Sequence, residues 1–296
     1  MDGIVSVNGE IFPVDQAKIS VLDRGFLFGD AIFEVLVAFK TKLIAISEHL
    51  TRLRFSAEKV GFELPWSDQE LSEEISKLCH LANFPKTYLR IGITRGEGLG
   101  LRTVKSSYTK ILYALPAIAI PENIYTKGVS LKTCSKGTLQ RGPLIKNPYY
   151  LPSIVAIREL HHQDFDDVLW VNHEQEITEA SSSNIFLIGR EANAMFIETP
   201  AIDSGLLRGV TRGIILKLLE DNDIAVRESP IYADELARFD EAFVCSTMRG
   251  IVPIRRIDDK NFESVRKTAA LNRVKSLFHA WVENQIGQQF DWNTGI

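Results

Sequence analysis

The order of strand-like and helix-like segments is the feature that most constrains the fold of this chain. In the N-terminal part, strand patterns come in adjacent pairs, and Asn8-Gly9, the favoured two-residue hairpin turn, separates the first two. The predicted strands lie at residues 4–7, 10–12, 32–39, 43–46, 87–95 and 109–115. Helical spacing of apolar residues predicts helices at 47–61, with Ser47 as N-cap and Gly61 as C-cap, and at 68–82. Adjacent strands of this kind pair antiparallel, so this part predicts an α+β unit.

A second α+β unit is predicted after a linker. Residues 116–127 carry two prolines and end before Gly128. The predicted strands that follow lie at 129–134, 167–171, 184–188, 194–198, 225–227 and 241–245, and the predicted helices at 152–162, 209–221 and 263–284. The interpretation is a small N-terminal domain (1–118), a linker (119–127) and a larger, β-rich C-terminal domain (128–296), with a cleft between the two domains.

Composition excludes several classes of protein. The 34 Lys and Arg residues against 38 Asp and Glu residues give a net charge of −4 without a basic face, which argues against a nucleic-acid partner. The N-terminal residues do not resemble a signal peptide, and the longest apolar run, 111–120, is too short to cross a membrane. Three dispersed cysteines, Cys79, Cys134 and Cys245, predict neither disulfides nor a metal site, and favour the cytoplasm.

Four positions could carry chemistry, and each also has an ordinary reading. Gly209 opens a predicted helix whose first N–H groups, at Val210 and Thr211, would suit a phosphate, although a plain helix start is the commoner case. Lys146 lies in an apolar, aromatic stretch that could make its amine nucleophilic, or it is a solvated lysine. Arg52 could form only a surface ion pair with Glu48, and Glu179 could be only an exposed strand-end carboxylate. The residues alone leave these alternatives open.

Taken in order along the chain, the motifs resemble those of the class IV aminotransferases, which bind pyridoxal phosphate in fold type IV. The matching motifs are Asp23-Arg24-Gly25, Phe28-Gly29-Asp30, Phe33-Glu34-Val35, Glu48-His49-Leu50-x-Arg52-Leu53, Tyr88-x-Arg90, Thr94-Arg95-Gly96, Lys146, residues 178–186 (Thr-Glu-Ala-Ser-Ser-Ser-Asn-Ile-Phe), Gly209-Val210-Thr211-Arg212 and Phe243-x-x-Ser246-Thr247. The resemblance spans essentially the whole chain.

The resemblance implies a set of cofactor contacts. Lys146 matches the lysine that forms the aldimine with pyridoxal phosphate and shuttles the α-proton, and Glu179 matches the carboxylate that pairs with the pyridine nitrogen. Arg52 matches the arginine that binds the cofactor phosphate, together with Val210, Thr211 and Thr247, and Leu207 matches a residue that packs on the ring. These residue types suit the chemistry, because a paired arginine and helix N–H groups bind a phosphate dianion and a carboxylate keeps a ring nitrogen protonated.

The resemblance also implies a substrate pocket made by Phe33, Tyr88, Arg90, Arg102, Tyr150 and Met248. D-amino-acid enzymes have a tyrosine where Phe33 stands and an Arg-x-His, whereas here Arg102 is followed by Thr103 and Val104. Branched-chain enzymes read Tyr-x-Arg, which is present as Tyr88-Leu89-Arg90. Among the arginines that could bind a substrate carboxylate (Arg90, Arg95, Arg102 and Arg249), Arg90 is the first choice.

The expected activity is therefore amino-group transfer, by ping-pong kinetics, between an amino acid and a 2-oxo acid. The amino acid would be a D-amino acid or a branched-chain L-amino acid. The alternative is the aminodeoxychorismate lyase reaction, which forms 4-aminobenzoate and pyruvate and which the glycine-rich stretch 94–102 favours. The family generally forms homodimers, so a homodimer is expected here.

Overall fold

A computed structural model of the protein describes residues 2–102, 107–135, 144–192, 194–266, 270–290 and 292. The chain forms two compact units. The first contains residues 1–119, 145–149 and 283–296, and the second contains residues 120–144 and 150–282. Thr103 and Val104, noted above as departures from the D-amino-acid pattern, lie outside the described residues.

Two segments that we expected in the C-terminal domain pack with the first unit instead. Residues 145–149 do so because the backbone N–H of Phe33 donates to the carbonyl of Lys146, with 3.0 Å between the atoms. Residues 283–296 do so because the ammonium group of Lys86 donates to the carbonyl of Trp292 at 2.5 Å. Both contacts join residues that are distant in sequence, so local patterns carried no sign of them.

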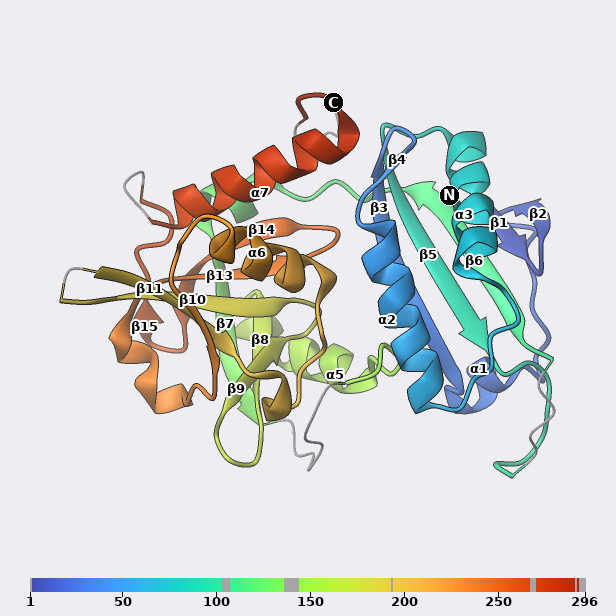
Figure 1. Ribbon diagram of the computed structural model, residues 1–296. Helices are drawn as coiled ribbons and strands as arrows, with labels where there is room; N and C mark the ends of the chain where they lie inside the picture. The colour runs from blue at the N-terminus through green and yellow to red at the C-terminus, as the bar shows by residue number, and fades with distance from the viewer. Residues whose placement is uncertain are drawn as a thin grey trace. The chain divides into compact units, whose positions relative to one another are not determined.

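The strands of the first unit form one antiparallel sheet in the order β2-β1-β6-β5-β3-β4 (Figure 1). Their bounds are β1 Ile4–Val7, β2 Glu10–Pro13, β3 Ala31–Phe39, β4 Lys42–Leu43, β5 Lys86–Thr94 and β6 Thr109–Pro116. The predicted α+β class and the first hairpin are confirmed. The predicted strand at 43–46 is shorter, because Ile44 and Ala45 turn directly into a helix.

Three helices are described in the first unit: α1 (Arg24–Phe28), α2 (Ile46–Lys59) and α3 (Asp68–Ala82). The prediction for α3 is confirmed, and a capping box of Ser67 and Glu70 fixes its start. The predicted N-cap of α2, Ser47, is wrong. The buried Ala45 holds that position in a left-handed conformation (φ 54°), and the Ser47 hydroxyl instead contacts the Glu48 carboxylate.

Helices α2 and α3 cover one face of the first sheet and build the core there. The alternation of β3 and β5 turns Ile32, Leu36, Leu89 and Ile91 toward the helices, where all four are buried. Residues of the opposite parity, among them Phe33, lie on the other face of the sheet.

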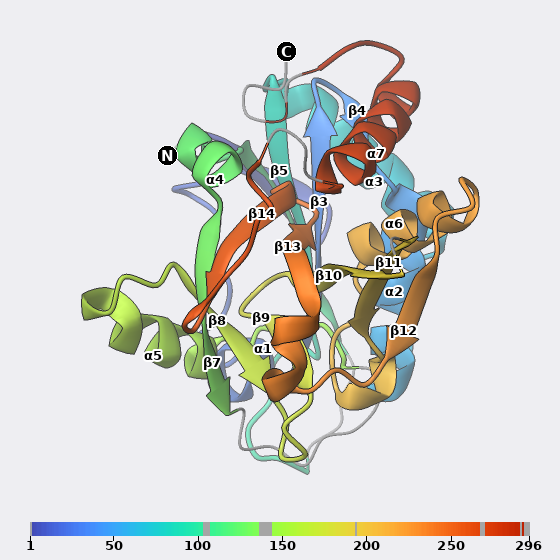
Figure 2. The same cartoon turned by 90° about the vertical axis from the view of Figure 1, so that its left-hand side faces the viewer.

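The second unit is built on a mixed sheet in the order β12-β11-β10-β13-β14-β7-β8-β9 (Figure 2). The bounds are β7 Val129–Ser135, β8 Asp167–Val171, β9 Ile177–Ala180, β10 Asn184–Glu191, β11 Ala194–Pro200, β12 Val226–Ser229, β13 Phe239–Ser246 and β14 Gly250–Ile257, and β15 (Lys260–Asn261) pairs with β14. The pairs β11–β12, β14–β7 and β7–β8 are parallel. Sequence patterns had missed β9, β14 and β15.

The second unit also contains the helices α4 (Glu122–Lys127), within the predicted linker, α5 (Leu151–Glu159), α6 (Val210–Glu220) and most of α7 (Leu271–Ile286). The predicted start of the last helix, at residue 263, is wrong. The Glu241 carboxylate of β13 accepts hydrogen bonds from the N–H groups of Ala270 and Leu271, each at 2.8 Å, and so fixes the start of α7. In the described part of the chain, no helix is long and apolar enough to cross a membrane.

Candidate active site

Arg52 lies in a buried polar cluster between α2 and β3 of the first unit. Its Nε donates to Glu34 Oε1 and its Nη2 donates to Glu34 Oε2, each at 2.7 Å. His49 Nδ1 lies 2.8 Å from Glu34 Oε2. The side chains of Glu34 and His49 are 0% and 1% exposed, and that of Arg52 is 9% exposed. Arg52 is therefore not limited to a surface ion pair with Glu48.

The charges in this cluster follow from the pKa shifts of Glu34 and His49. Burial would raise the pKa of Glu34, but the charge of Arg52 and the hydrogen bonds from Arg52 and His49 outweigh it and lower the pKa to about 2. Burial lowers the pKa of His49. The hydrogen bond and negative charge of Glu34 raise it, but burial together with the positive charges of Arg52 and Lys146 outweighs them. At neutral pH Glu34 is ionised and His49 is neutral. An ionised carboxylate only accepts, so His49 carries its proton on Nδ1 and donates it to Glu34.

Lys146 is fastened to the first unit through both of its backbone polar groups. Its carbonyl accepts from the N–H of Phe33, and its own N–H donates to Ser56 Oγ of α2 at 3.3 Å. The side chain is half-buried, with Nζ 4.7 Å from the centroid of the Phe33 ring. Ser56 follows Arg52 by one helical turn. The structure thus brings Lys146 and Arg52 to one part of α2.

The face of the first sheet that carries Phe33, opposite to the face covered by α2 and α3, also carries two other predicted substrate residues. Phe33, Tyr88 and Arg90 share a face of β3 and β5, and the guanidinium carbon of Arg90 lies 4.0 Å from the Phe33 ring centroid. Tyr113 of β6 lies directly across from Arg90. Burial raises the pKa of the Tyr113 phenol, although the charge of Arg90 opposes this shift. Sequence reasoning missed Tyr113, which the alternation of β6 could have placed on this face.

In the second unit, Glu179 is held at the end of β9. Its Oε2 accepts hydrogen bonds from the N–H of Leu207 at 3.2 Å and from Asn184 Nδ2 at 3.3 Å. Asn184 Nδ2 also donates to the carbonyl of Leu207 at 3.0 Å. The half-buried carboxylate is thus oriented by the same loop that carries Leu207, and it is not an ordinary exposed strand end. Sequence reasoning missed the role of Asn184.

Gly209, Val210 and Thr211 form the start of α6. A Cβ atom on Gly209 would lie 1.8 Å from Asn184 Oδ1, so the absence of a side chain at this glycine admits the amide of Asn184. Gly209 is the N-cap, and Val210 and Thr211 are buried in the first turn. Thr247 lies in the turn that follows β13 and is half-buried, as is Met248 beside it.

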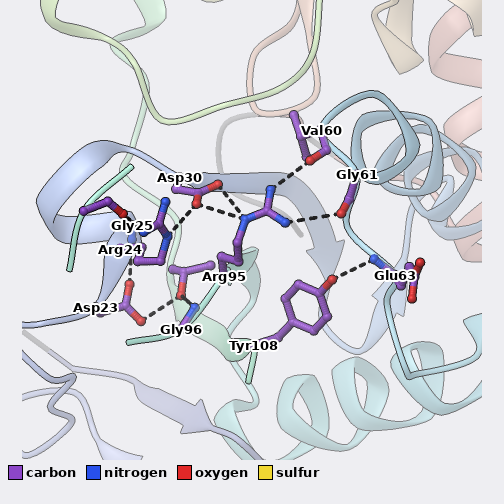
Figure 3. A network of polar contacts seen from close by, with 12 residues as sticks. Asp23, Arg24, Gly25, Asp30, Val60, Gly61, Glu63, Arg95, Gly96 and Tyr108 are labelled. Atoms are coloured by element: carbon purple, nitrogen blue, oxygen red, sulfur yellow. Dashed lines mark hydrogen bonds and ion pairs between the residues drawn. The ribbon is translucent and has the colours of Figure 1, made fainter. Parts of the chain in front are cut away.

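The remaining arginine candidates occupy different surroundings. Figure 3 shows that Arg95 Nε donates to the Asp30 carboxylate (3.0 Å to Oδ2), while its Nη1 and Nη2 donate to the carbonyls of Gly61 and Val60. Arg95 therefore caps the C-terminal end of α2, a structural role that the sequence did not indicate.

Arg102 is exposed, and Arg249 is half-buried. The carbonyl of Arg249 accepts from the Tyr125 hydroxyl at 2.9 Å. Tyr150 is the half-buried N-cap residue of α5. These positions leave Arg90 as the arginine that shares a sheet face with other predicted pocket residues.

Comparison with known proteins identifies the family. The family model described as amino-transferase class IV matches residues 31–257. The chain therefore belongs to the class IV aminotransferases. It is an enzyme of this family, and as a member it uses the family's cofactor, pyridoxal phosphate. Its mixed fold is that of fold type IV.

The relatives of this chain include aminotransferases named for two different substrate classes. A putative branched-chain-amino-acid aminotransferase of Methanocaldococcus jannaschii is 27% identical over 278 residues, which cover 93% of this chain and 94% of the relative. A D-alanine aminotransferase of Listeria monocytogenes is 30% identical over 258 residues, which cover 86% and 87%.

Solved structures share the fold. A branched-chain amino acid aminotransferase from Escherichia coli superposes with a TM-score of 0.83 at 23% identity, covering 98% of this chain and 97% of that chain. A putative 4-amino-4-deoxychorismate lyase from Legionella pneumophila superposes with a TM-score of 0.78 at 22% identity, covering 90% and 96%. At these identities the two structures report on the fold alone.

The residues present fit pyridoxal phosphate. An arginine, the N-terminus of an eleven-residue helix and threonine hydroxyls are the donors that a phosphate dianion needs. A carboxylate suits the ring nitrogen, and a lysine amine suits the aldehyde. Among the described residues, the buried hydroxyl of Ser183, in the loop after Glu179, has no hydrogen-bond partner, which is consistent with a polar ligand beside this loop.

Proposed function

We propose that this enzyme transfers an amino group between an amino acid and a 2-oxo acid, with Lys146 as its catalytic residue. The observation that supports this most directly is the anchoring of Lys146 to β3 and α2, one helical turn from Arg52. A lysine that merely covers apolar surface has no need of backbone contacts to two elements. Here the contacts hold the Lys146 backbone one turn of α2 from the buried, paired Arg52.

The proposed roles follow from the chemistry of each group. Pyridoxal phosphate, when bound, supplies an aldehyde that amines join covalently and a ring that takes up the electron pair left by a departing α-proton. The Lys146 amine moves a proton at the substrate Cα, acting first as base and then as acid. Glu179 accepts a hydrogen bond from the ring nitrogen, and Leu207 packs on the ring. The phosphate is bound by Arg52 and by Val210, Thr211 and Thr247.

The substrate carboxylate is assigned to Arg90, with Phe33, Tyr88, Arg102, Tyr150 and Met248 as further pocket residues. Arg90 suits this role because its guanidinium lies against the Phe33 ring, within the same sheet face as Tyr88. Stacking on an aromatic ring orients a guanidinium and leaves its in-plane N–H bonds directed away from the ring.

The test of this function is a substrate panel on one preparation. D-alanine and L-leucine, each with a 2-oxo acid acceptor, are compared with aminodeoxychorismate. The relatives named for branched-chain and D-alanine aminotransfer make either of the first two the expected amino donor. Initial rates are expected to show a ping-pong pattern. Pyruvate and 4-aminobenzoate formed from the last substrate alone would establish the lyase reaction instead.

A homodimer is also proposed, supported by an apolar surface of the first unit that we call the α1 patch. It consists of Val21, Leu22, Phe26, Phe28, Leu99 and Leu101, of which Val21, Phe26, Leu99 and Leu101 are at least 66% exposed. The patch comes from two segments of the chain, residues 21–28 and residues 99–101. These segments lie side by side, because the N–H of Gly98 donates to the carbonyl of Leu22 at 3.1 Å. Contiguous apolar surface of this kind marks association sites. Light scattering tests the dimer, and Phe26→Ser is expected to favour monomer.

A cytoplasmic location is proposed as well, on the grounds that Cys79, Cys134 and Cys245 are free thiols.

A further inference from the structure

The pairing of Glu34 with Arg52 has the geometry of an orienting contact. Two N–H bonds of one guanidinium edge donate to the two oxygens of one carboxylate, both at 2.7 Å. This fork fixes the plane of the guanidinium and therefore the direction of all its N–H bonds. A single long ion pair would leave the group free to rotate about its terminal bonds.

His49 fixes the carboxylate in turn. Its Nδ1–H donates to Glu34 Oε2, the oxygen that also accepts from Arg52 Nη2. Because Glu34 is ionised and His49 is neutral, the three side chains together carry no net charge. The cluster therefore contributes orientation to Arg52 rather than additional positive charge.

Stability alone does not explain this cluster. Glu34 points into the apolar layer between β3 and α2, where its neighbours of the same parity, Ile32 and Leu36, are fully buried. Burying a carboxylate and a guanidinium costs more desolvation than an apolar pair at such a position, and apolar replacements of buried ion pairs are often at least as stable. A charged cluster at this site is better explained by what it does for Arg52.

We propose that Glu34 is a positioning residue that holds the Arg52 guanidinium in the orientation that binds the cofactor phosphate, and that His49 holds Glu34 in place. The inference rests on the proposed function, in which Arg52 contacts that phosphate. Glu34 and His49 themselves are given no contact with the cofactor or with substrate.

The experiment compares two ligands that differ only in the phosphate. Dissociation constants of the apoprotein for pyridoxal phosphate and for pyridoxal are measured by fluorescence titration in the wild type, Glu34→Gln and His49→Gln. Glu48→Gln, on an exposed residue of α2, is the matched control. Glu34→Gln is expected to raise the dissociation constant for pyridoxal phosphate about tenfold and to leave that for pyridoxal unchanged. The magnitude is that found when residues that hydrogen-bond to metal ligands are replaced. His49→Gln is expected to act in the same direction.

Each result bears on the inference. Equal weakening of both ligands by Glu34→Gln would indicate a merely structural role and overturn it. Tighter binding of pyridoxal phosphate by Glu34→Gln would also overturn it, because Glu34 would then be repelling the phosphate. If the wild type has equal dissociation constants for the two ligands, Arg52 does not bind the cofactor phosphate, and the inference about Glu34 is overturned as well. If Glu34→Gln does not fold by circular dichroism, Glu34→Asp, which keeps the charge but shortens the fork, is expected to show the selective loss.

Discussion

The backbone N–H of Lys146 donates to Ser56 Oγ across a separation of 90 residues, with 3.3 Å between the two atoms. Since Ser56 lies one turn of α2 beyond Arg52, a single helix positions both the proposed catalytic amine and the proposed phosphate ligand. The strand on the other side does the same, because Phe33 binds the Lys146 carbonyl and Glu34 binds Arg52.

Removal of the Ser56 hydroxyl is expected to destabilise the first unit. Ser56→Ala leaves the Lys146 N–H without this acceptor, which costs about 1–2 kcal/mol in the free energy of unfolding. Urea denaturation of the apoprotein measures the loss. Ser47→Ala, at an exposed position of α2, is the control. A loss no larger than that of the control would show that the contact does not hold the Lys146 segment.

Lys146→Ala is expected to abolish covalent attachment of pyridoxal phosphate and the transferase activity. The other residues assigned to the cofactor carry no amine that could react with its aldehyde. Borohydride reduction followed by mass spectrometry of the digested protein locates the attachment, and Lys42→Ala is an exposed control. Recovery of the reduced cofactor on a different lysine of the wild type would refute the assignment, as would a wild-type spectrum that stays unchanged after cofactor is added.

Acid is expected to destabilise the protein in two stages. The folded-state pKa values of His49 and Glu34 are both lowered, so the unfolded state binds more protons as the pH falls. The contribution of His49 is complete above its ordinary pKa of 6.5 and declines below it, and that of Glu34 declines as the pH falls from 4.5 toward about 2. Urea denaturation of the apoprotein at pH 7.5, 6 and 5 measures the first stage. His49→Gln should reduce the dependence of the free energy of unfolding on pH between pH 7.5 and 5. The same dependence in this variant as in the wild type would show that His49 is not the group responsible.

Gly209→Ala is expected to disturb the start of α6 by steric contact alone. The φ angle of −65° is open to alanine, but its Cβ would lie 1.8 Å from Asn184 Oδ1. Overpacking of this kind costs about 1–3 kcal/mol, and weaker cofactor binding should accompany it because the Glu179 contact to Asn184 shifts.

Gly213 supplies the control within the same helix. A Cβ there meets nothing within 4 Å among the described atoms, so Gly213→Ala should stabilise α6 by about 0.5–1 kcal/mol. Combining Gly209→Ala with Asn184→Ala should recover part of the loss through non-additivity. If the losses in the free energy of unfolding caused by Gly209→Ala and Asn184→Ala simply add in the double variant, steric contact between the new Cβ and Asn184 is not the cause of the first loss.

Arg90→Leu is expected to raise KM for the amino acid, because a carboxylate hydrogen-bonded to a guanidinium contributes about 1.5–3 kcal/mol. At 1.5 kcal/mol, this corresponds to a roughly tenfold change in KM. Steady-state kinetics of Arg90→Leu and Arg102→Leu are compared, with Arg158→Leu as an exposed control on α5. A larger effect of Arg102→Leu would transfer the carboxylate role to that residue.

Much of the fold was predictable because local periodicity determines it. The hairpin at Asn8-Gly9 and helix α3 lie where the sequence predicts them, since turn preference, capping and the spacing of apolar residues act over only a few positions. The alternation of β3 puts the Glu34 carboxylate on the core face, where it requires a buried cation opposite, and this is a signal that the sequence prediction did not use.

The tertiary structure decided which distant groups meet. The start of α7 depends on Glu241, the anchoring of Lys146 depends on Ser56, and the orientation of Glu179 depends on Leu207 and Asn184. A hydrogen bond between residues far apart in sequence leaves no periodic trace in either segment. The sequence by itself therefore determined most of the elements and the family's residue types, whereas the strands β9, β14 and β15, the start of α7 and the orientation of each reactive group were decided by contacts formed only on folding.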